Sequence, residues 1–264
     1  MKKHIIILFA SFCILAISCG GGSDSPGLDF IFQDSSEISE IRCYHLHPWS
    51  DEGEIHSGID ISPKYADLIG TSTVRKTPIV APCSGVIEKF IEHTSGAGAK
   101  MYSFVIKIND YWRVLMSFEP QTADAAIITE QENNFLVSEG EEVTKGQLMG
   151  NLVYGKLLED HYPHIHFSVL YIKPGDTIDS LAADILNVPR NNGTPTPPPR
   201  EGATSPWEAE DLGTASQFFC PYLYFTNAAQ TVLNSVPKYS VNSDLCTCSC
   251  AYNSANGDCG VCTP

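Results

Sequence analysis

Residues 163–170 read PHIHFSVL, and this short stretch carries the pattern that decides the fold. In an extended strand, side chains two positions apart share a face. His164, His166 and Ser168 therefore lie on one face, and the apolar residues between them point to the other. Such alternation is typical of a strand that covers an apolar core with one face. We expect the polar face to present two imidazoles side by side to a groove.

A second polar string, HSGID at residues 56–60, lies much earlier in the chain. It supplies His56 and Asp60, and Gly58 between them allows the backbone a tight turn. One histidine and the carboxylate of this string, with one histidine of the later string, would form a metal-binding tripod with an open position for water. The remaining histidine could accept and return a proton. This donor set is the one that a catalytic zinc site needs.

The segment around these strings is predicted to be rich in β-strands. Residues 104–108 and 112–116 alternate in polarity, and turns containing glycine or proline separate several short apolar runs. Many short strands at close spacing favour an all-β core, an antiparallel sheet sandwich or barrel with a groove. Beyond it, residues 178–186 carry a helical apolar pattern that Pro189 ends.

The two strings belong to a longer series of motifs that resembles the lysostaphin/LytM-type zinc metallopeptidases, which cut peptide bridges in bacterial peptidoglycan. The resemblance covers residues 43–171, and ordered motifs are more specific than any single one. It implies a core of the duplicated-hybrid-motif type. The matching elements are His47-Pro48, His56-x-Gly58-x-Asp60, Thr77-Pro78-Ile79-Val80-Ala81-Pro82-x-x-Gly85-Val86-Ile87, Val137-x-x-Gly140-x-x-Val143-x-x-Gly146-Gln147-x-x-Gly150 and Pro163-His164-Ile165-His166-Phe167.

The resemblance assigns roles to individual residues. It implies one Zn²⁺ per domain, with His56, Asp60 and His166 as the metal ligands. It also implies that His164 is the catalytic histidine beside the metal, serving as general base and then passing its proton to the leaving amine. The activity implied is that of a zinc metalloendopeptidase acting on peptidoglycan cross-links or similar Gly/Ala-rich peptides.

Ser117 departs from the family pattern. The family usually has a histidine in a Tyr-x-His-Leu string, and residues 115–118 read LMSF here. A serine hydroxyl can donate a hydrogen bond but carries no positive charge, and loss of one transition-state donor typically costs on the order of 10²–10³ in rate. Glu119, on the same strand face, could act as an acid if its pKa is raised, or His161 or His93 could come from a neighbouring loop. The alternative is a weak or inactive envelope protein that acts as a wall-binding or regulatory module.

The N-terminus has the features of a secretory signal, with Lys2 and Lys3 before an apolar run at residues 5–17. Small residues before Cys19 resemble a bacterial lipobox, which implies that Cys19 is lipidated and becomes the mature N-terminus; an ordinary signal peptide is the alternative. Gly20 rather than Asp follows, which favours the outer membrane. The expected location is the cell envelope, on the periplasmic or surface side, with a lipid anchor in the membrane.

Charge and cysteine content constrain the partners. The formal net charge of −15 makes nucleic acid an unfavourable partner, because an acidic surface repels phosphates. Eight cysteines follow Cys19, and an even number in an exported chain indicates disulfides. Cys43 and Cys83 could pair, whereas the cysteines from Cys246 to Cys262 could alternatively form a zinc knot.

We therefore expect residues 1–19 to be the signal peptide and 20–38 a flexible tether. The metallopeptidase-like β domain would span residues 39–190, followed by a Pro-rich linker at 191–206 and a Cys-rich tail at 207–264. One helix is expected within residues 222–236. The tail is either an appendage that binds the wall or an envelope protein partner, or a cap packed on the main domain.

Overall fold

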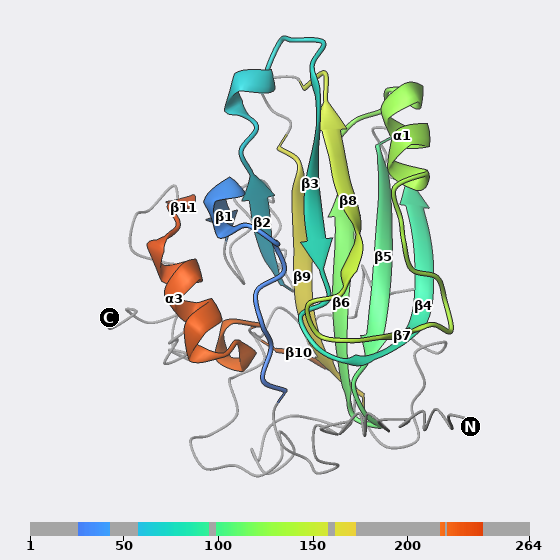
Figure 1. The fold of residues 1–264 in the computed structure, drawn as a ribbon, viewed down its shortest axis with the longest axis vertical. Coiled ribbons are helices and arrows are strands. Elements are labelled where there is room, and N and C mark those ends of the chain that lie inside the picture. Colours follow the sequence, from blue (N-terminus) through green and yellow to red (C-terminus); the bar gives the residue numbers. More distant parts are fainter. Residues whose placement is uncertain are drawn as a thin grey trace, which may run out of the picture.

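The structure is a computed structural model, and it describes residues 26–42, 58–94, 99–157, 162–172, 217–219 and 221–239 (Figure 1). Antiparallel strands make up most of this part of the chain. The elements are η1 (Ser35–Glu37), β1 (Ile38–Arg42), β2 (Ile59–Pro63), η2 (Ala66–Leu68), β3 (Val74–Val80), β4 (Gly85–Thr94), β5 (Lys100–Lys107), β6 (Trp112–Glu119), α1 (Ala125–Glu132), β7 (Glu142–Val143), β8 (Leu148–Gly155), β9 (His164–Tyr171), β10 (Gln217–Phe219), η4 (Pro221–Tyr224), α3 (Asn227–Ser235) and β11 (Lys238–Tyr239).

The strands form one large sheet and one separate pair. The large sheet has the order β11-β1-β2-β9-β6-β5-β4-β7, with β10 also paired to β9, and β3 pairs with β8 (Figure 1). Among these strand pairs, only β1–β11 is parallel. This arrangement confirms the predicted all-β antiparallel core.

A short turn joins β5 to β6 and illustrates how local sequence shapes the sheet. The side chain of Asn109 accepts hydrogen bonds from the backbone N–H groups of Tyr111 and Trp112, both at 2.9 Å. An asparagine side chain that accepts backbone N–H groups in this way satisfies donors that the sheet leaves unpaired at the strand end, and so stabilises the reversal of chain direction. The turn sets the β5–β6 register, in which Ser103 lies opposite Ser117.

The main apolar core lies on one face of the large sheet. Ile165, Phe167 and Val169 of β9 belong to it, together with residues of β6, β3 and β8 such as Met116 and Leu152. A smaller apolar cluster, formed by Val105, Leu115, Leu170 and Ile172, is separate from it. The alternation predicted for residues 163–170 is therefore confirmed, and the two histidines lie on the face opposite the main core.

The predicted tether at residues 20–38 is wrong over the part that the structure describes. Leu28 and Ile31 are completely buried in the main core. The N–H of Leu28 donates to the Tyr224 carbonyl, and the N–H of Val80 donates to the Ile31 carbonyl, each at 2.8 Å. Burial of these apolar side chains in the core is more favourable in free energy than their exposure to water in a tether.

The expected helix at residues 222–236 is confirmed over α3, whereas the preceding turn η4 is a 3₁₀ helix. The Thr226 hydroxyl caps α3 by accepting the N–H of Ala229 at 3.3 Å, and Ala229 and Leu233 are buried in the main core. β10 and β11 also pair with β9 and β1. Residues 217–219 and 221–239 thus form a cap on the β domain.

Several expectations lie outside the described residues and stay predictions. These are the signal peptide with Cys19, the helix at 178–186, the linker at 191–206, the cysteines of the tail, and Cys43. Because Cys43 is among them, its pairing with the buried Cys83 is untested. The helices within the described part of the chain are too short or too polar to cross a membrane.

Candidate metal centre

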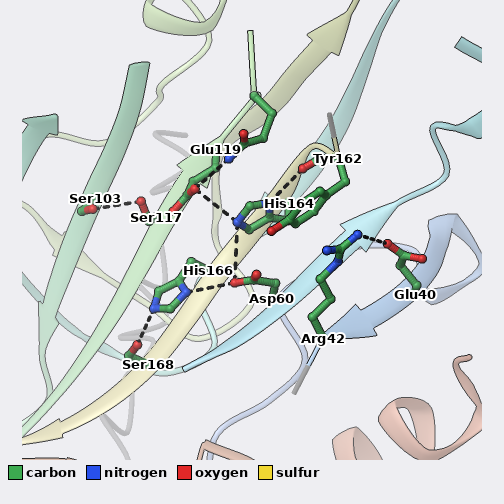
Figure 2. A network of polar contacts seen from close by, with 11 residues as sticks. Glu40, Arg42, Asp60, Ser103, Ser117, Glu119, Tyr162, His164, His166 and Ser168 are labelled. Atoms are coloured by element: carbon green, nitrogen blue, oxygen red, sulfur yellow. Dashed lines mark hydrogen bonds and ion pairs between the residues drawn. The ribbon is translucent and has the colours of Figure 1, made fainter. Parts of the chain in front are cut away.

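The strand register gathers the predicted site residues on one face of the sheet. β9 runs between β2 and β6, so that His166 lies opposite both Asp60 and Ser117, while His164 lies opposite Glu119. Directly opposed residues of antiparallel strands share a face. Figure 2 shows these side chains gathered around the two imidazoles. His56, the remaining predicted ligand, lies outside the described residues.

Asp60 and His166 form the closest contact of the site. Oδ1 of Asp60 lies 2.9 Å from Nδ1 of His166, and the Oγ of Ser168 lies 2.9 Å from the other ring nitrogen, Nε2 (Figure 2). Asp60 and His166 are both buried. The imidazole is therefore held at both nitrogens, with Nδ1 facing the Asp60 carboxylate and Nε2 facing the Ser168 hydroxyl, which would fix the ring orientation of a ligand that binds through Nδ1.

His164 faces oxygen atoms at both of its ring nitrogens. Its Nδ1 donates to the backbone carbonyl of Tyr162 at 2.9 Å. Its Nε2 lies 3.2 Å from Oε2 of Glu119 and 3.5 Å from Oδ1 of Asp60. The side-chain amide of Gln121 also donates to Glu119 Oε2, at 3.1 Å. These contacts orient His164 so that Nε2 is the ring atom facing the carboxylates.

The charges of this group shift its pKa values. Burial alone would lower the pKa of His164, but the carboxylates of Asp60 and Glu119 outweigh it and raise that pKa to about 9. Burial favours the neutral form of Glu119 and would raise its pKa. The interaction with His164 outweighs this effect and holds the pKa of Glu119 below its ordinary value. A role for Glu119 as an acid would require a raised pKa, and these contacts produce the opposite shift.

The donor atoms present fit part of a zinc site. Two ligands bound to zinc at 2.0–2.2 Å in tetrahedral geometry lie about 3.3 Å apart. The separation of Asp60 Oδ1 from His166 Nδ1, 2.9 Å, is close to this value. Within the described ranges, no group of three or more His, Cys, Asp or Glu residues is arranged to hold a metal ion. The described residues thus include two of the three predicted ligands, close together and with the nitrogen and oxygen donors that zinc accepts.

Gly58 is required here for a different reason from the one expected. A Cβ at Gly58 would press on the Phe167 carbonyl oxygen and lie 2.5 Å from Ser168 Oγ and 2.9 Å from His166 Nε2. Gly58 is not among the glycines with a positive φ. The expected turn is present as a bend at Gly58 directly before β2, but the close approach of the backbone to His166 is what requires glycine at this position.

Ser117 is fully buried, and its Oγ accepts a hydrogen bond from the Oγ of Ser103 at 3.0 Å (Figure 2). The β6–β9 register places Ser117 opposite His166, so a neutral hydroxyl occupies the position where the family pattern expects a histidine. His93 is exposed on β4, three strands away from β9. Strand spacing of 4.7–4.9 Å places it roughly 14 Å from β9, too far to contact His164. His161 lies outside the described residues.

Two residues near His164 escaped the sequence-based prediction. The ring of Tyr162 stacks on that of His164, and the guanidinium of Arg42 lies over the Tyr162 ring. Arg42 is opposite Asp60 in the β1–β2 register. Tyr162 could have been suspected from its position two residues before His164. Nothing in the local pattern marks Arg42, because its place depends on the pairing of β1 with β2.

Neither a protein-family model nor a curated protein matches this chain. Solved structures that resemble it include the antimicrobial peptidase lysostaphin from Staphylococcus simulans, at 20% identity, with 66% of this chain and 60% of that chain covered and a TM-score of 0.32. A mutant catalytic domain of the prophage-encoded M23 protein EnpA from Enterococcus faecalis is 19% identical, with 56% and 92% covered and a TM-score of 0.36. The SpoIIQ–SpoIIIAH pore-forming complex matches at 15% identity, with 55% and 84% covered and a TM-score of 0.37.

Proposed function

We propose that this chain is a zinc-dependent endopeptidase of the bacterial envelope that hydrolyses peptide bonds in peptidoglycan cross-links or similar Gly/Ala-rich peptides. One observation carries the proposal: Asp60 Oδ1 lies 2.9 Å from His166 Nδ1 and 3.5 Å from His164 Nε2. The carboxylate and the two imidazoles that the motifs single out thus converge on one point. The ordered motifs of residues 43–171 add support from the sequence.

Zinc would be held by His56, Asp60 and His166. When bound, it would polarise a water molecule and the scissile carbonyl. The pKa of His164 would then fall from about 9, because a nearby dication opposes protonation, and a neutral imidazole would become available.

His164 would act as the general base through Nε2. Its Nδ1 is committed to the Tyr162 carbonyl, so only Nε2 can take a proton and return it to the leaving amine. Glu119, 3.2 Å from Nε2, would stabilise the protonated imidazole by its negative charge. Glu119 thus supports the base instead of serving as an acid.

A second candidate function is a zinc-binding module without turnover, with a wall-binding or regulatory role. The observation that favours it is Ser117, which is buried and bonded to Ser103 where a cationic donor would be needed. A developing oxyanion would gain less from a serine hydroxyl than from a protonated histidine.

The proposed cellular location and partners of the chain rest on sequence signals. We propose that Cys19 carries a lipid, that the anchor holds the chain in the envelope, most simply at the outer membrane, and that the Cys-rich tail contacts an envelope protein. Globomycin treatment with mass spectrometry of Cys19 tests the lipid. An unmodified Cys19 at a processed N-terminus would contradict the anchor.

The test of the activity uses the chain without residues 1–19, with bound zinc and peptidoglycan cleavage measured together. Asp60→Ala and His166→Ala should abolish zinc binding, and His164→Ala should abolish cleavage while zinc remains. Asp67→Asn is the matched control, because Asp67 is an exposed carboxylate paired with Arg75 away from the site. No zinc in the metal-supplied protein would overturn both the site and the activity. Zinc without cleavage would favour the second candidate.

A further inference from the structure

His164 is the inner layer of a three-residue stack. The Tyr162 and His164 rings lie 4.8 Å apart between centroids, with an angle of 19° between their planes. Cζ of the Arg42 guanidinium lies 3.3 Å from the centroid of the same Tyr162 ring. Figure 2 shows Arg42, Tyr162 and His164 close together. The layers come from β1, from the residues just before β9, and from β9 itself.

Tyr162 restrains the imidazole in two independent ways. Its ring limits the tilt of the imidazole plane, and its backbone carbonyl accepts the Nδ1–H of His164 at 2.9 Å. A flat contact and a hydrogen bond in the ring plane together leave the imidazole little freedom to rotate about its side-chain torsions. Nε2 is consequently directed at Asp60 and Glu119.

The outer layer is itself anchored. Nη2 of Arg42 lies 3.4 Å from Oε1 of Glu40, and the Tyr65 hydroxyl donates to the same oxygen at 3.1 Å. Arg42 is buried, so its guanidinium is partly desolvated over the aromatic ring, where a cation–π contact is strongest. Burial raises the pKa of the Tyr162 phenol, so the ring stays neutral beneath the cation. The stack therefore joins β1 to the start of β9.

We infer that Tyr162, backed by Arg42, is a positioning residue that holds the His164 imidazole with Nε2 towards the reacting atoms. This inference rests on the proposed function, because it gives the stack a role in orienting His164 as the general base. Geometry is decisive for a base, because a misplacement of about 1 Å can cost roughly 10²-fold in rate.

The test compares Tyr162→Ala with Tyr162→Phe in the full-length protein. The alanine variant removes the ring and keeps the backbone carbonyl, and should lower kcat by about 10- to 100-fold, with KM and zinc content unchanged. The phenylalanine variant restores the ring face and should restore kcat to within about threefold of the wild type. Wild-type kcat in the alanine variant, or an equal loss in both variants, would overturn the inference.

A readout without turnover separates this inference from the proposed function. In the NMR spectrum of chelator-treated protein, the His164 ring protons should feel the ring current of the aromatic residue at 162. Their chemical shifts should change in Tyr162→Ala and return in Tyr162→Phe, even where the wild type cleaves no peptide. Unchanged shifts in the alanine variant would overturn the stack whatever the activity. Tyr162→Leu, which fills the space without an aromatic face, replaces the alanine variant where that variant does not fold.

Discussion

Asp60 and His166 are separated by 106 positions in the sequence, yet Oδ1 of Asp60 lies 2.9 Å from Nδ1 of His166. The antiparallel register of β2 and β9 places the two residues directly opposite each other. The same carboxylate oxygen lies 3.5 Å from Nε2 of His164. One carboxylate therefore links the predicted ligand to the predicted base.

Asp60→Asn should weaken zinc binding by at least about tenfold, because a neutral amide is a poorer zinc ligand than a carboxylate. Competition with a chromophoric chelator measures the affinity. Asp67→Asn should leave it unchanged, since Asp67 pairs with Arg75 at the surface. Equal affinity in Asp60→Asn and the wild type would remove Asp60 from the ligand set.

Gly58→Ala should destabilise the fold by about 1–3 kcal/mol, because its Cβ would push against the Phe167 backbone and His166. Denaturant unfolding of the zinc-free protein measures this change without interference from the metal. Gly27→Ala is the control, since a Cβ there meets only Thr226 Cγ2 at 3.9 Å. Similar midpoints for the two variants would contradict the close approach of Gly58 to His166.

The ion pair of His164 and Glu119 predicts a pH dependence of stability in chelator-treated protein. The pKa of His164 rises from 6.5 to about 9 on folding, so its contribution is fully present below pH 6.5 and is lost as the pH rises through about 9. The pKa of Glu119 falls below 4.5, so its contribution is present above pH 4.5 and is lost as the pH drops through the lowered value.

The wild type should therefore exceed Glu119→Gln in free energy of unfolding most strongly between pH 4.5 and 6.5, and the difference should shrink at high pH. Urea unfolding of both proteins from about pH 4 to about pH 10 measures this difference. A difference that stays constant up to pH 10 would show that the two side chains do not form an ion pair.

Ser117→His should restore the donor that the family pattern expects, at the expense of roughly 1–3 kcal/mol of stability from overpacking. Ser117 is fully buried opposite Ser103. The double variant with Ser117→His and Ser103→Gly should therefore recover part of this loss, because glycine at position 103 leaves space for the imidazole. Thermal unfolding and peptidoglycan cleavage are measured together. Cleavage that appears only with histidine at position 117 would identify the native chain as a degenerate peptidase, and an unchanged melting temperature would contradict the tight packing.

The faces of individual strands could be predicted from the sequence. Side chains alternate across a strand because of covalent geometry, so the pattern of residues 163–170 was enough to separate His164 and His166 from the core residues Ile165 and Phe167. The antiparallel all-β class followed from many short strands with turns between them.

Compositional averages were less informative than single residues. The stretch at residues 20–38 was expected to be a tether because glycine, serine and aspartate are frequent in it. Leu28 and Ile31 are nevertheless buried in the main core. A few apolar side chains suffice to dock a segment when a matching apolar surface exists, and that surface is formed by distant parts of the chain.

The sequence by itself therefore determined which side chains share a face, the antiparallel class and the identity of the candidate ligands. Only the tertiary structure decided that Glu119 lies opposite His164, that Arg42 stacks on Tyr162, and that Gly58 must be small. The physical reason is that alternation is a property of one strand, whereas register arises from pairing between strands far apart in sequence, where a shift of one residue would turn every side chain to the other face.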